Sequence, residues 1–316
     1  MRVAVFGAGG IGAYFGGRLA LAGVEVELIA RGAHLEALRR DGLRVQSTRG
    51  DFEIVLPATD DPADIGPVDF VLFTVKSQDT GAAAARLGPL LHPDTAVVSL
   101  QNGLGNVEAI AAEIGSGHTM GGAAYLLSTI AEPGLVVHSA GPATLIFGES
   151  DGRRSDRALQ LLDALLAGGV EATLSDEIWR SVWDKFAFIC ALSGMTAAVR
   201  LPIGDIRSVR DSWQMFRGIL REVAAVATAE GIDLSDDALD RHEALALGLE
   251  PGTFSSLHYD MTHGKPMELE ALHGELLRRA RNHGLAVPAT QAIYAILRPW
   301  AVRNTSPADG CSNETR

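Results

Sequence analysis

Lys185 is a candidate for a group that releases a proton during a reaction. It lies in a helical stretch over residues 183–190 that is otherwise apolar apart from Asp184. A lysine in such surroundings either extends its ammonium to solvent or faces a polar partner, so a simple pairing with Asp184 or with a residue one turn away is the alternative. Only three of the 27 basic residues are lysines, namely Lys76, Lys185 and Lys265. Because an ammonium can release a proton and a guanidinium cannot, a lysine retained in an arginine-rich chain indicates a chemical role.

A glycine-rich segment near the N-terminus has the spacing of a phosphate-binding loop. It consists of Gly7, Ala8, Gly9, Gly10, Ile11 and Gly12. An expected strand over residues 2–6 precedes it, an expected helix follows it, and a second strand begins near residue 25, which is the context that a GxGxxG motif requires. Glycines there allow a tight turn and let a pyrophosphate approach backbone N–H groups at a helix N-terminus. The segment therefore predicts a bound dinucleotide, the alternative being a glycine-rich turn without a ligand.

The residue at the end of the second expected strand indicates which dinucleotide is bound. Sites selective for NAD place an acidic residue there to bind the ribose 2′-hydroxyl, but this chain has Arg31. A guanidinium suits a 2′-phosphate in charge and in bidentate geometry. The sequence therefore favours NADP over NAD, unless Arg31 is only a solvated surface residue. His34 could assist, although a histidine at a helix N-terminus is more often a surface residue.

Two further polar residues, Lys76 and Asn102, follow the expected strands at 70–75 and 96–100. In an open α/β sheet, ligands bind beyond the carboxyl ends of the strands. We therefore expect the glycine-rich loop, Arg31, Lys76 and Asn102 to converge on one crevice. The alternative for Asn102 is an ordinary turn, because Asn-Gly is a common turn sequence.

The elements that must position these residues change character near residue 173. Up to that point, short β-branched strands alternate with alanine-rich helices, which indicates βαβ units and a parallel sheet. From residue 176 on the pattern is helical, with segments at 176–199, 213–230 and 266–282. The sequence thus predicts an α/β fold with a Rossmann-type doubly wound sheet over residues 1–173, followed by an all-helical domain over residues 174–303. Residues 304–316 are polar and aperiodic, and we expect them to be disordered.

Some local features make sharper predictions. Residues 43–47 and 52–56 flank a turn and predict a hairpin, and residues 135–139 and 143–147, joined through Gly141, predict a second one. Ser235 is expected to cap a helix. Pro266 is expected at the first position of a helix that ends before Gly284.

Composition argues against several classes of protein. The net charge of −12 disfavours a nucleic-acid-binding protein, which would carry a basic face. Two cysteines, Cys190 and Cys311, cannot form a disulfide framework, and no cysteine- or histidine-rich cluster suggests a metal. No run of about 20 apolar residues suggests a membrane span, and a chain that begins on a strand leaves no room for a signal peptide. These features favour a cytoplasmic protein.

Together, the motifs resemble the ketopantoate reductase (2-dehydropantoate 2-reductase) family. The likeness spans nearly the whole chain in the correct order. It is carried by the glycine-rich loop, Arg31, Lys76, residues 101–103, residues 183–185, Ser255, Ser256, Asp260 and Glu268. The resemblance implies reduction of a 2-oxo acid to a 2-hydroxy acid, ketopantoate to pantoate in pantothenate biosynthesis, with NADPH as cofactor.

The resemblance also implies roles for individual residues. Lys185 would be the general acid that protonates the carbonyl oxygen, and its ammonium would stabilise the negative charge that develops there. Asn102 would bind substrate and cofactor, and Ser256 the substrate carboxylate. Glu268 would anchor the cofactor or the substrate hydroxyl near Lys185, whereas the residues alone indicate only an acid in the first turn of a helix. Lys265 either approaches the cofactor or lies on the surface.

The chain departs from the family pattern where the substrate is expected to bind. Ile189, Ser193, Ile203 and Thr253 stand where the well-known members carry asparagines. Loss of amide groups removes hydrogen-bond partners of a polar substrate and makes the pocket more apolar. We therefore hypothesise that the reaction is preserved and that the substrate is bulkier or less polar than ketopantoate.

Two other functions remain open. One is a related reductase acting on an imine or a β-hydroxy acid, and the other is a non-catalytic protein that senses NADP. Retention of Lys185 and Glu268 argues against the second. The expected partner is a small-molecule 2-oxo acid, and the helical domain could support a homodimer, although no feature of the sequence requires one.

Overall fold

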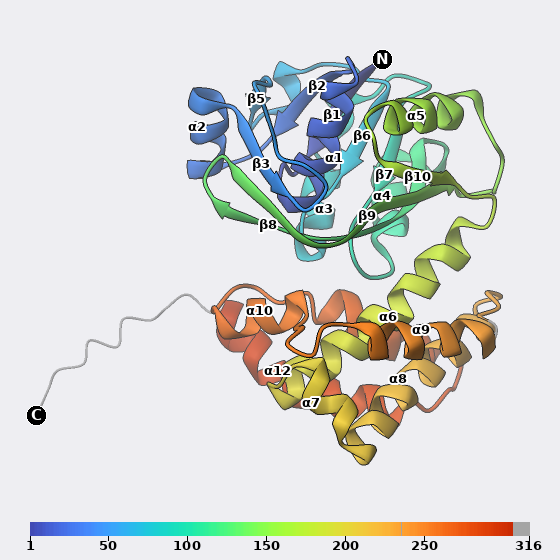
Figure 1. The fold of residues 1–316 in the computed structure, drawn as a ribbon. Coiled ribbons are helices and arrows are strands. Elements are labelled where there is room, and N and C mark those ends of the chain that lie inside the picture. The colour runs from blue at the N-terminus through green and yellow to red at the C-terminus, as the bar shows by residue number, and fades with distance from the viewer. Residues whose placement is uncertain (235, 306–316) are drawn as a thin grey trace, which may run out of the picture. The chain divides into compact units, whose positions relative to one another are not determined.

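The computed structural model describes residues 1–234 and 236–305 of the 316-residue chain. The chain divides into two compact units, Met1–Val182 and Trp183–Arg316. This division lies inside helix α6 (Ile178–Val199), somewhat beyond the boundary near residue 173 that composition suggested. Figure 1 shows the strands gathered in the first unit and helices alone in the second.

Six strands of the first unit form a parallel sheet of the doubly wound type. In chain order they are β1 (Arg2–Phe6), β2 (Glu25–Ile29), β5 (Ala58–Thr59), β6 (Phe70–Phe73), β7 (Ala96–Ser99) and β8 (Thr119–Glu132). Their order across the sheet is β5-β2-β1-β6-β7-β8, and every neighbouring pair is parallel. This is the strand order 3-2-1-4-5-6 of dinucleotide-binding sheets. The predicted fold class is confirmed.

Four more strands extend this sheet and make it mixed. They are β3 (Leu43–Ser47), β4 (Phe52–Ile54), β9 (Leu135–Glu149) and β10 (Glu171–Leu174). Strand β9 runs antiparallel to β8, while β3 and β10 both pair with β9 in parallel. The predicted hairpin at 43–56 is confirmed by the antiparallel pairing of β3 with β4.

The second predicted hairpin is wrong. Residues 135–139 and 143–147 both belong to β9, and the hairpin partner of β9 is β8. Gly141 has a φ of 92°, Ala143 has a φ of 55°, and the register with β8 shifts near Leu127. A Cβ on Gly141 would lie 3.0 Å from the Cα of Leu126. The glycine therefore marks an irregularity within a long paired strand, and a sequence signal for a turn does not distinguish the two cases.

Helices bury both faces of the sheet. The first unit contains α1 (Gly10–Leu21), α2 (Gly32–Asp41), α3 (Thr80–Ala84), α4 (Asn106–Ile114) and α5 (Asp156–Ala167), with short 3₁₀ turns η1 (Pro62–Asp64), η2 (Ser77–Asp79), η3 (Gly88–Leu90) and η4 (Ser116–His118). Val3 and Val5 of β1 pack into one apolar core with residues of α1 and α5, whereas Ala4 and Phe6 pack into another with residues of α3 and α4. Alternate side chains of the strand thus serve opposite faces, which explains its continuous apolar run.

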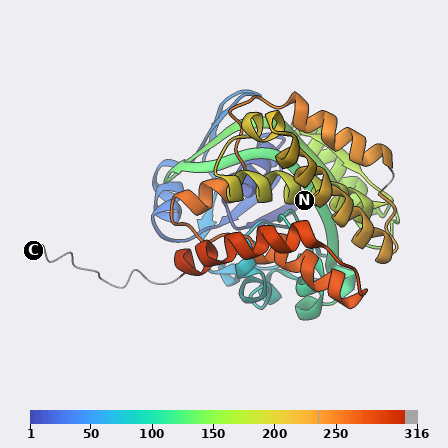
Figure 2. The same ribbon diagram turned by 90° about the horizontal axis from the view of Figure 1, so that it is seen from below.

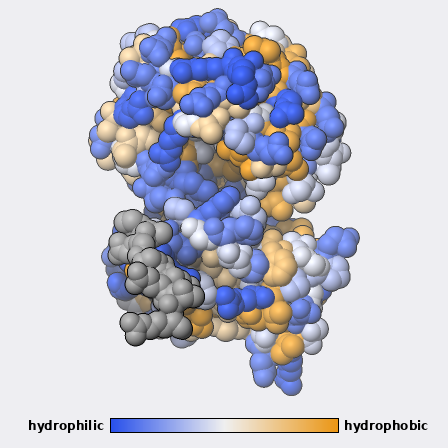
Figure 3. Space-filling model, turned by 90° about the vertical axis from the view of Figure 1, so that its left-hand side faces the viewer, coloured by the Kyte–Doolittle hydropathy of each residue, from blue (hydrophilic) through white to orange (hydrophobic). Residues whose placement is uncertain are grey.

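The described part of the second unit is helical. It contains α7 (Ile203–Ser208), α8 (Arg210–Ala229), α9 (Asp236–Gly248), α10 (Ser256–Thr262), α11 (Glu275–Asn282) and α12 (Pro288–Thr305), besides most of α6. Figure 2 shows α12 as the long red helix of this unit. By length and hydropathy α6 could cross a membrane, but 56% of its apolar window is buried inside the structure, as in the core helix of a globular unit. The face in Figure 3 carries hydrophilic side chains interspersed with apolar ones.

Three local predictions for this unit need correction or fall outside the structure. The helix predicted over 266–282 starts later: residues Glu270–Gly274 form a π-helical turn, η5, and only Glu275–Asn282 are α-helical. Helix α12 continues through Thr305, past the predicted start of a disordered tail, and Asn304 on it donates from Nδ2 to the carbonyl of Lys265 at 3.0 Å. Ser235 and residues 306–316, including the rest of that tail, lie outside the described residues.

Candidate active site

Three glycines of the loop after β1 are required by neighbours within the protein. Gly7 has a φ of 102°, and a Cβ there would lie 2.9 Å from the backbone nitrogen of Val75. A Cβ on Gly10 would collide with the carbonyl of Ser128, and one on Gly12 would collide with the hydroxyl of Thr74. These positions explain the motif by packing alone, without a ligand.

Gly9 has a different environment. The nearest atom to a Cβ built there is the carbonyl oxygen of Gly7 at 4.0 Å, so the space beside it is open. Gly9 is the N-cap of α1, no side chain caps that helix end, and its first turn holds no acidic residue. Free N–H groups and the helix dipole make such an end suitable for an anion. The loop therefore fits a pyrophosphate by chemistry and by space.

Arg31 is directed to solvent at the end of β2. Its side chain is 87% exposed, and Nη2 lies 2.9 Å from Oδ2 of Asp79 in η2. An exposed guanidinium can reach a phosphate, and Asp79 is an acidic neighbour that the sequence did not single out. The two residues are 48 positions apart in the chain. They come together because Arg31 follows β2 and Asp79 follows β6, and both strands run parallel to β1, so that their carboxyl ends lie at the same edge of the sheet.

The loops after β6 and β7 are joined by hydrogen bonds. The carbonyl of Asn102 accepts from Oγ of Ser77 at 2.9 Å and from Nδ2 of Asn106 at 3.0 Å. Gln101 Nε2 donates to the carbonyl of Val75 at 3.0 Å. Because β1, β2, β6 and β7 are parallel, the glycine-rich loop, Arg31, Lys76 and Asn102 all follow the carboxyl ends of neighbouring strands. This edge of the sheet is where ligands bind in such folds.

Lys185 is half-buried on α6, and its charge is coupled to Glu268. Burial lowers the pKa of Lys185 from 10.5 to about 8, while the negative charge of Glu268 acts to raise it. Glu268 is only 8% exposed and lies just before η5. Holding an ammonium in this environment costs the folded protein roughly 3 kcal/mol at neutral pH. A lysine whose pKa is lowered to near neutral pH, and whose charge interacts with that of a buried acid, has the properties of a catalytic group.

The remaining predicted residues differ in their burial. Ile189, Thr253 and Ser256 are half-buried, and Ser193 is buried on α6. Ile203 is fully buried and its N–H donates to the carbonyl of Thr253 at 3.0 Å, so it belongs to the core of the unit.

Of the adjacent serines, Ser255 is the helix cap. Its Oγ accepts from the N–H of His258 and from the hydroxyl of Thr196. Ser256 is the first residue of α10 and does not serve as that cap.

Comparison with known protein families identifies relatives of both units of the chain. The family model for ketopantoate reductase PanE/ApbA matches residues 3–152, and that for the C-terminal part of the same family matches residues 177–301. The chain belongs to the ketopantoate reductase family.

Relatives of the ketopantoate reductase family match over nearly their full length. The 2-dehydropantoate 2-reductase of Halobacterium salinarum is 32% identical, with 94% of this chain and 98% of the relative covered. The crystal structure of a PanE/ApbA family ketopantoate reductase from Ralstonia eutropha matches with a TM-score of 0.89 and 33% identity, covering 97% of this chain and all of the other. That of the 2-dehydropantoate 2-reductase from Geobacter metallireducens matches with a TM-score of 0.88 and 31% identity, covering 95% and 99%.

Two histidines near these ketopantoate reductase motifs were missed or misjudged from the sequence. His34 is half-buried, and both of its ring nitrogens contact backbone groups, so it is held by the fold although part of it remains at the surface. His242 of α9 is buried, and its Nε2 lies 3.2 Å from Oδ1 of Asp184. Asp184 is thus next to a residue of another helix, which the sequence alternative of a simple Lys185–Asp184 pair did not anticipate. The sequence gives no signal for either histidine. The partners of His34 are backbone groups, and Asp184 is 58 positions away from His242.

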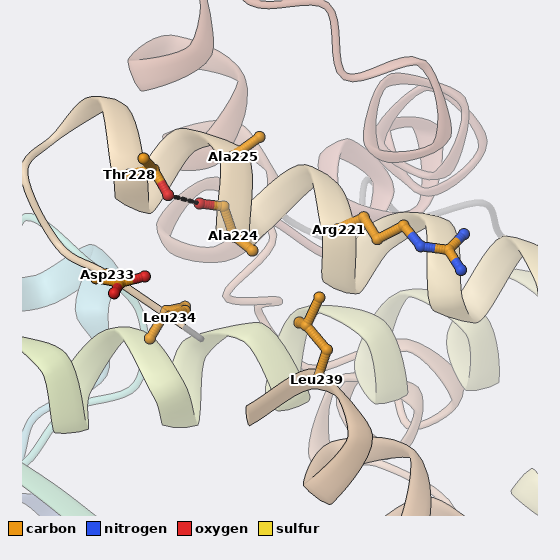
Figure 4. A pocket seen from close by; sticks show the side chains of 7 residues that line it. All are labelled: Arg221, Ala224, Ala225, Thr228, Asp233, Leu234 and Leu239. Atoms are coloured by element: carbon orange, nitrogen blue, oxygen red, sulfur yellow. Dashed lines mark hydrogen bonds between the residues drawn. The ribbon is translucent and has the colours of Figure 1, made fainter. Parts of the chain in front are cut away.

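A hollow of about 540 Å³ lies elsewhere in the helical unit of this ketopantoate reductase family member. Figure 4 shows it between α8 and the segment that leads into α9, lined by Arg221, Ala224, Ala225, Thr228, Asp233, Leu234 and Leu239. None of these seven residues is among those predicted to bind substrate or cofactor. We assign the hollow no part in the reaction.

Proposed function

We propose that this protein reduces a 2-oxo acid to a 2-hydroxy acid with NADPH, and that Lys185 is the general acid. The observation that carries the proposal is the half-buried Lys185, whose pKa burial lowers to about 8 and which is coupled to the buried acid Glu268. Membership of the ketopantoate reductase family makes ketopantoate the first candidate substrate.

The residues of the first unit bind and orient the cofactor in this proposal. The open space at Gly9 and the uncapped N-terminus of α1 would hold the pyrophosphate. The Arg31 guanidinium would bind the 2′-phosphate, with Lys76 near the same edge of the sheet. Bound there, NADPH would supply the hydride, and Asn102 would hydrogen-bond cofactor and substrate.

Lys185 and its neighbours handle the charge that appears on the substrate. Negative charge develops on the carbonyl oxygen during reduction, and an ammonium in a partly desolvated site stabilises it and then donates its proton. With a pKa of about 8, Lys185 is protonated at neutral pH and still acidic enough to transfer the proton. Ser256 would bind the substrate carboxylate, and Glu268 would keep Lys185 charged and anchor the cofactor or the substrate hydroxyl.

The side chain of the substrate is proposed to be less polar than that of ketopantoate. Ile189 offers no hydrogen bond, while Ser193 and Thr253 offer shorter groups than the amides of well-known members. A pocket that offers no hydrogen-bond partner to a substrate hydroxyl gives little preference to substrates that carry one. A cytoplasmic enzyme of this kind agrees with an α6 that is mostly buried in the protein.

The test is the oxidation of NADPH, followed by absorbance, with ketopantoate and with a panel of branched and aromatic 2-oxo acids. Turnover with at least one oxo acid is expected, and Lys185→Ala should abolish it while NADPH binding stays nearly intact. Arg221→Ala, at the exposed hollow on α8, is the matched control and should leave turnover unchanged. Binding of NADPH without turnover on any oxo acid would favour an NADP sensor, and a clear preference for ketopantoate would refute the less polar substrate.

A further inference from the structure

His34 connects the glycine-rich loop to another segment of the first unit. It lies in the first turn of α2, with Nε2 2.8 Å from the carbonyl oxygen of Ala8 and Nδ1 3.1 Å from the backbone nitrogen of Gly134. A backbone N–H can only donate, so Nδ1 is the acceptor and Nε2 carries the hydrogen that it donates to Ala8. Burial lowers the pKa of His34, which keeps this neutral form dominant at neutral pH.

The contact to Ala8 falls at the peptide that enters the open part of the loop. The N–H of Ala8 donates to the carbonyl of Ile29 at 3.0 Å, and the N–H of Gly9 donates to the carbonyl of Gly7 at 2.6 Å. The Ala8–Gly9 peptide is planar, so His34 on its oxygen and Gly7 on its hydrogen together determine its orientation. If the peptide turned over, both hydrogen bonds would be lost and the backbone that leads into the N-terminus of α1 would change its shape.

The contact to Gly134 holds His34 itself in place. Gly134 lies between β8 and β9 with a φ of 80°, and a Cβ there would be 3.2 Å from that of Ala37 on α2. Its carbonyl accepts from the N–H of Arg44 at 2.9 Å. The strand connection is therefore packed against α2 and braces the imidazole from the side opposite the loop.

We propose that His34 is a positioning residue for dinucleotide binding: by donating to the Ala8 carbonyl it keeps the entrance of α1 shaped for a pyrophosphate. The inference rests on the proposed function, because it needs a dinucleotide in that loop. Helix α2 also begins next to Arg31, so the same contact links the sites proposed for the pyrophosphate and the 2′-phosphate.

Two substitutions separate the contacts of His34. His34→Gln retains a donor long enough to reach Ala8, whereas His34→Asn retains an acceptor near the position of Nδ1 but has no donor at the position of Nε2. Thr95→Val is the matched control, because it removes a buried hydrogen bond to the carbonyl of Val68, and these two residues precede β7 and β6 at the opposite edge of the sheet from the loop. The readouts are the Kd for NADPH by fluorescence titration, KM and kcat, and the melting temperature.

His34→Asn should raise the Kd and the KM for NADPH about tenfold, the equivalent of one hydrogen bond, with kcat at saturating NADPH and the KM for the oxo acid unchanged. His34→Gln should stay within about threefold of wild type, and Thr95→Val should change only the melting temperature. The inference is overturned if His34→Asn lowers the melting temperature but leaves the Kd as in wild type, or if Gln is the worse replacement. A wild-type protein that binds no dinucleotide would overturn the proposed function and this inference with it.

Discussion

Glu268→Gln should move the pH range in which the protein is active. Glu268 is 8% exposed, and its negative charge raises the pKa of Lys185 against the larger, opposite effect of burial, with a balance at about 8. The substitution removes the charge while keeping the shape of the side chain, so the effect of burial remains unopposed. An opposite charge nearby moves a pKa by about 1 to 3, which places Lys185 of the variant at roughly 5 to 7.

The sign of the change in rate follows from the proton that Lys185 must donate. Reduction requires the protonated lysine, so kcat/KM of the wild-type protein should fall about tenfold per pH unit above pH 8. For a variant pKa of about 6, the protonated fraction at pH 7.5 is roughly 25-fold smaller than in wild type, and at pH 5.5 the two differ by less than about twofold. The deficit of the variant should therefore shrink steadily as the pH falls.

The assay is kcat/KM for the oxo acid at saturating NADPH between pH 5 and 10, in buffers of constant ionic strength. Glu270→Gln is the matched control, since Glu270 is an exposed acid two residues away that is bonded to Tyr294 and Arg298. Its profile should overlay that of wild type. A Glu268→Gln variant whose activity is reduced by the same factor at every pH would refute the electrostatic reasoning and leave the proposed contact with cofactor or substrate as the only role of Glu268.

Three further predictions concern the first unit. Arg31→Ala should raise the KM for NADPH at least about tenfold and hardly change that for NADH, because only the former carries a 2′-phosphate; equal effects would remove that argument. Gly9→Ala should keep the melting temperature but weaken NADPH binding, since the Cβ fills open space, whereas Gly10→Ala should lower the melting temperature by collision with a backbone carbonyl; thermal scans with and without NADPH separate the two. Glu149→Gln should destabilise the unit by about 3 kcal/mol in urea titrations, because Arg157 loses the buried carboxylate that neutralises its charge and keeps only uncharged partners such as the carbonyl of Gly117; an unchanged urea midpoint would show the ion pair to be dispensable.

The pH dependence of that last effect has a defined sign. Burial acts to raise the pKa of Glu149, but hydrogen bonds from Arg157 and Ser155 outweigh it and hold the pKa below its usual range. A carboxylate with a lowered pKa stabilises the folded protein above its unfolded pKa, and that stabilisation is lost as the pH falls through the folded pKa. The difference in stability between wild type and Glu149→Gln should therefore be full at pH 7 and diminish under acid conditions.

The local sequence pattern was sufficient to predict those elements whose structure depends mainly on residues that are adjacent in the chain. Strand β1 was predicted with its observed bounds, since every residue from Val3 to Phe6 is apolar and both faces of the sheet are covered. The GxGxxG loop was recognisable because the strand before it and the helix after it are adjacent in the chain. Parallel strands joined by helices leave few topologies, so the edge that carries Arg31, Lys76 and Asn102 followed from their positions after strands.

The wrong predictions concern segments whose structure depends on contacts with residues far away in the chain. Gly141 lies in a strand, not at a turn, because β8 pairs with β9 on both sides of it, up to Ala140 and again from Thr144. The helix predicted from Pro266 begins instead with a π-helical turn at Glu270–Gly274, which carries His273. The ring of His273 packs against Gly194 and donates to the carbonyl of Cys190. A close contact between side chain and backbone across 83 residues has no periodic trace in the sequence.

The sequence by itself determined the chemical inventory of this protein: a glycine-rich loop in the context of a dinucleotide site, an arginine where NAD-binding chains have an acid, and a lysine in an apolar helix. Only the tertiary structure decided the state of those groups. The pKa of Lys185 depends on its burial and on Glu268, and the carbonyl of Ala8 in the loop accepts a hydrogen bond from His34. Residue types set what a side chain can do, whereas desolvation and long-range contacts set its charge and its orientation, and these arise only when the chain folds.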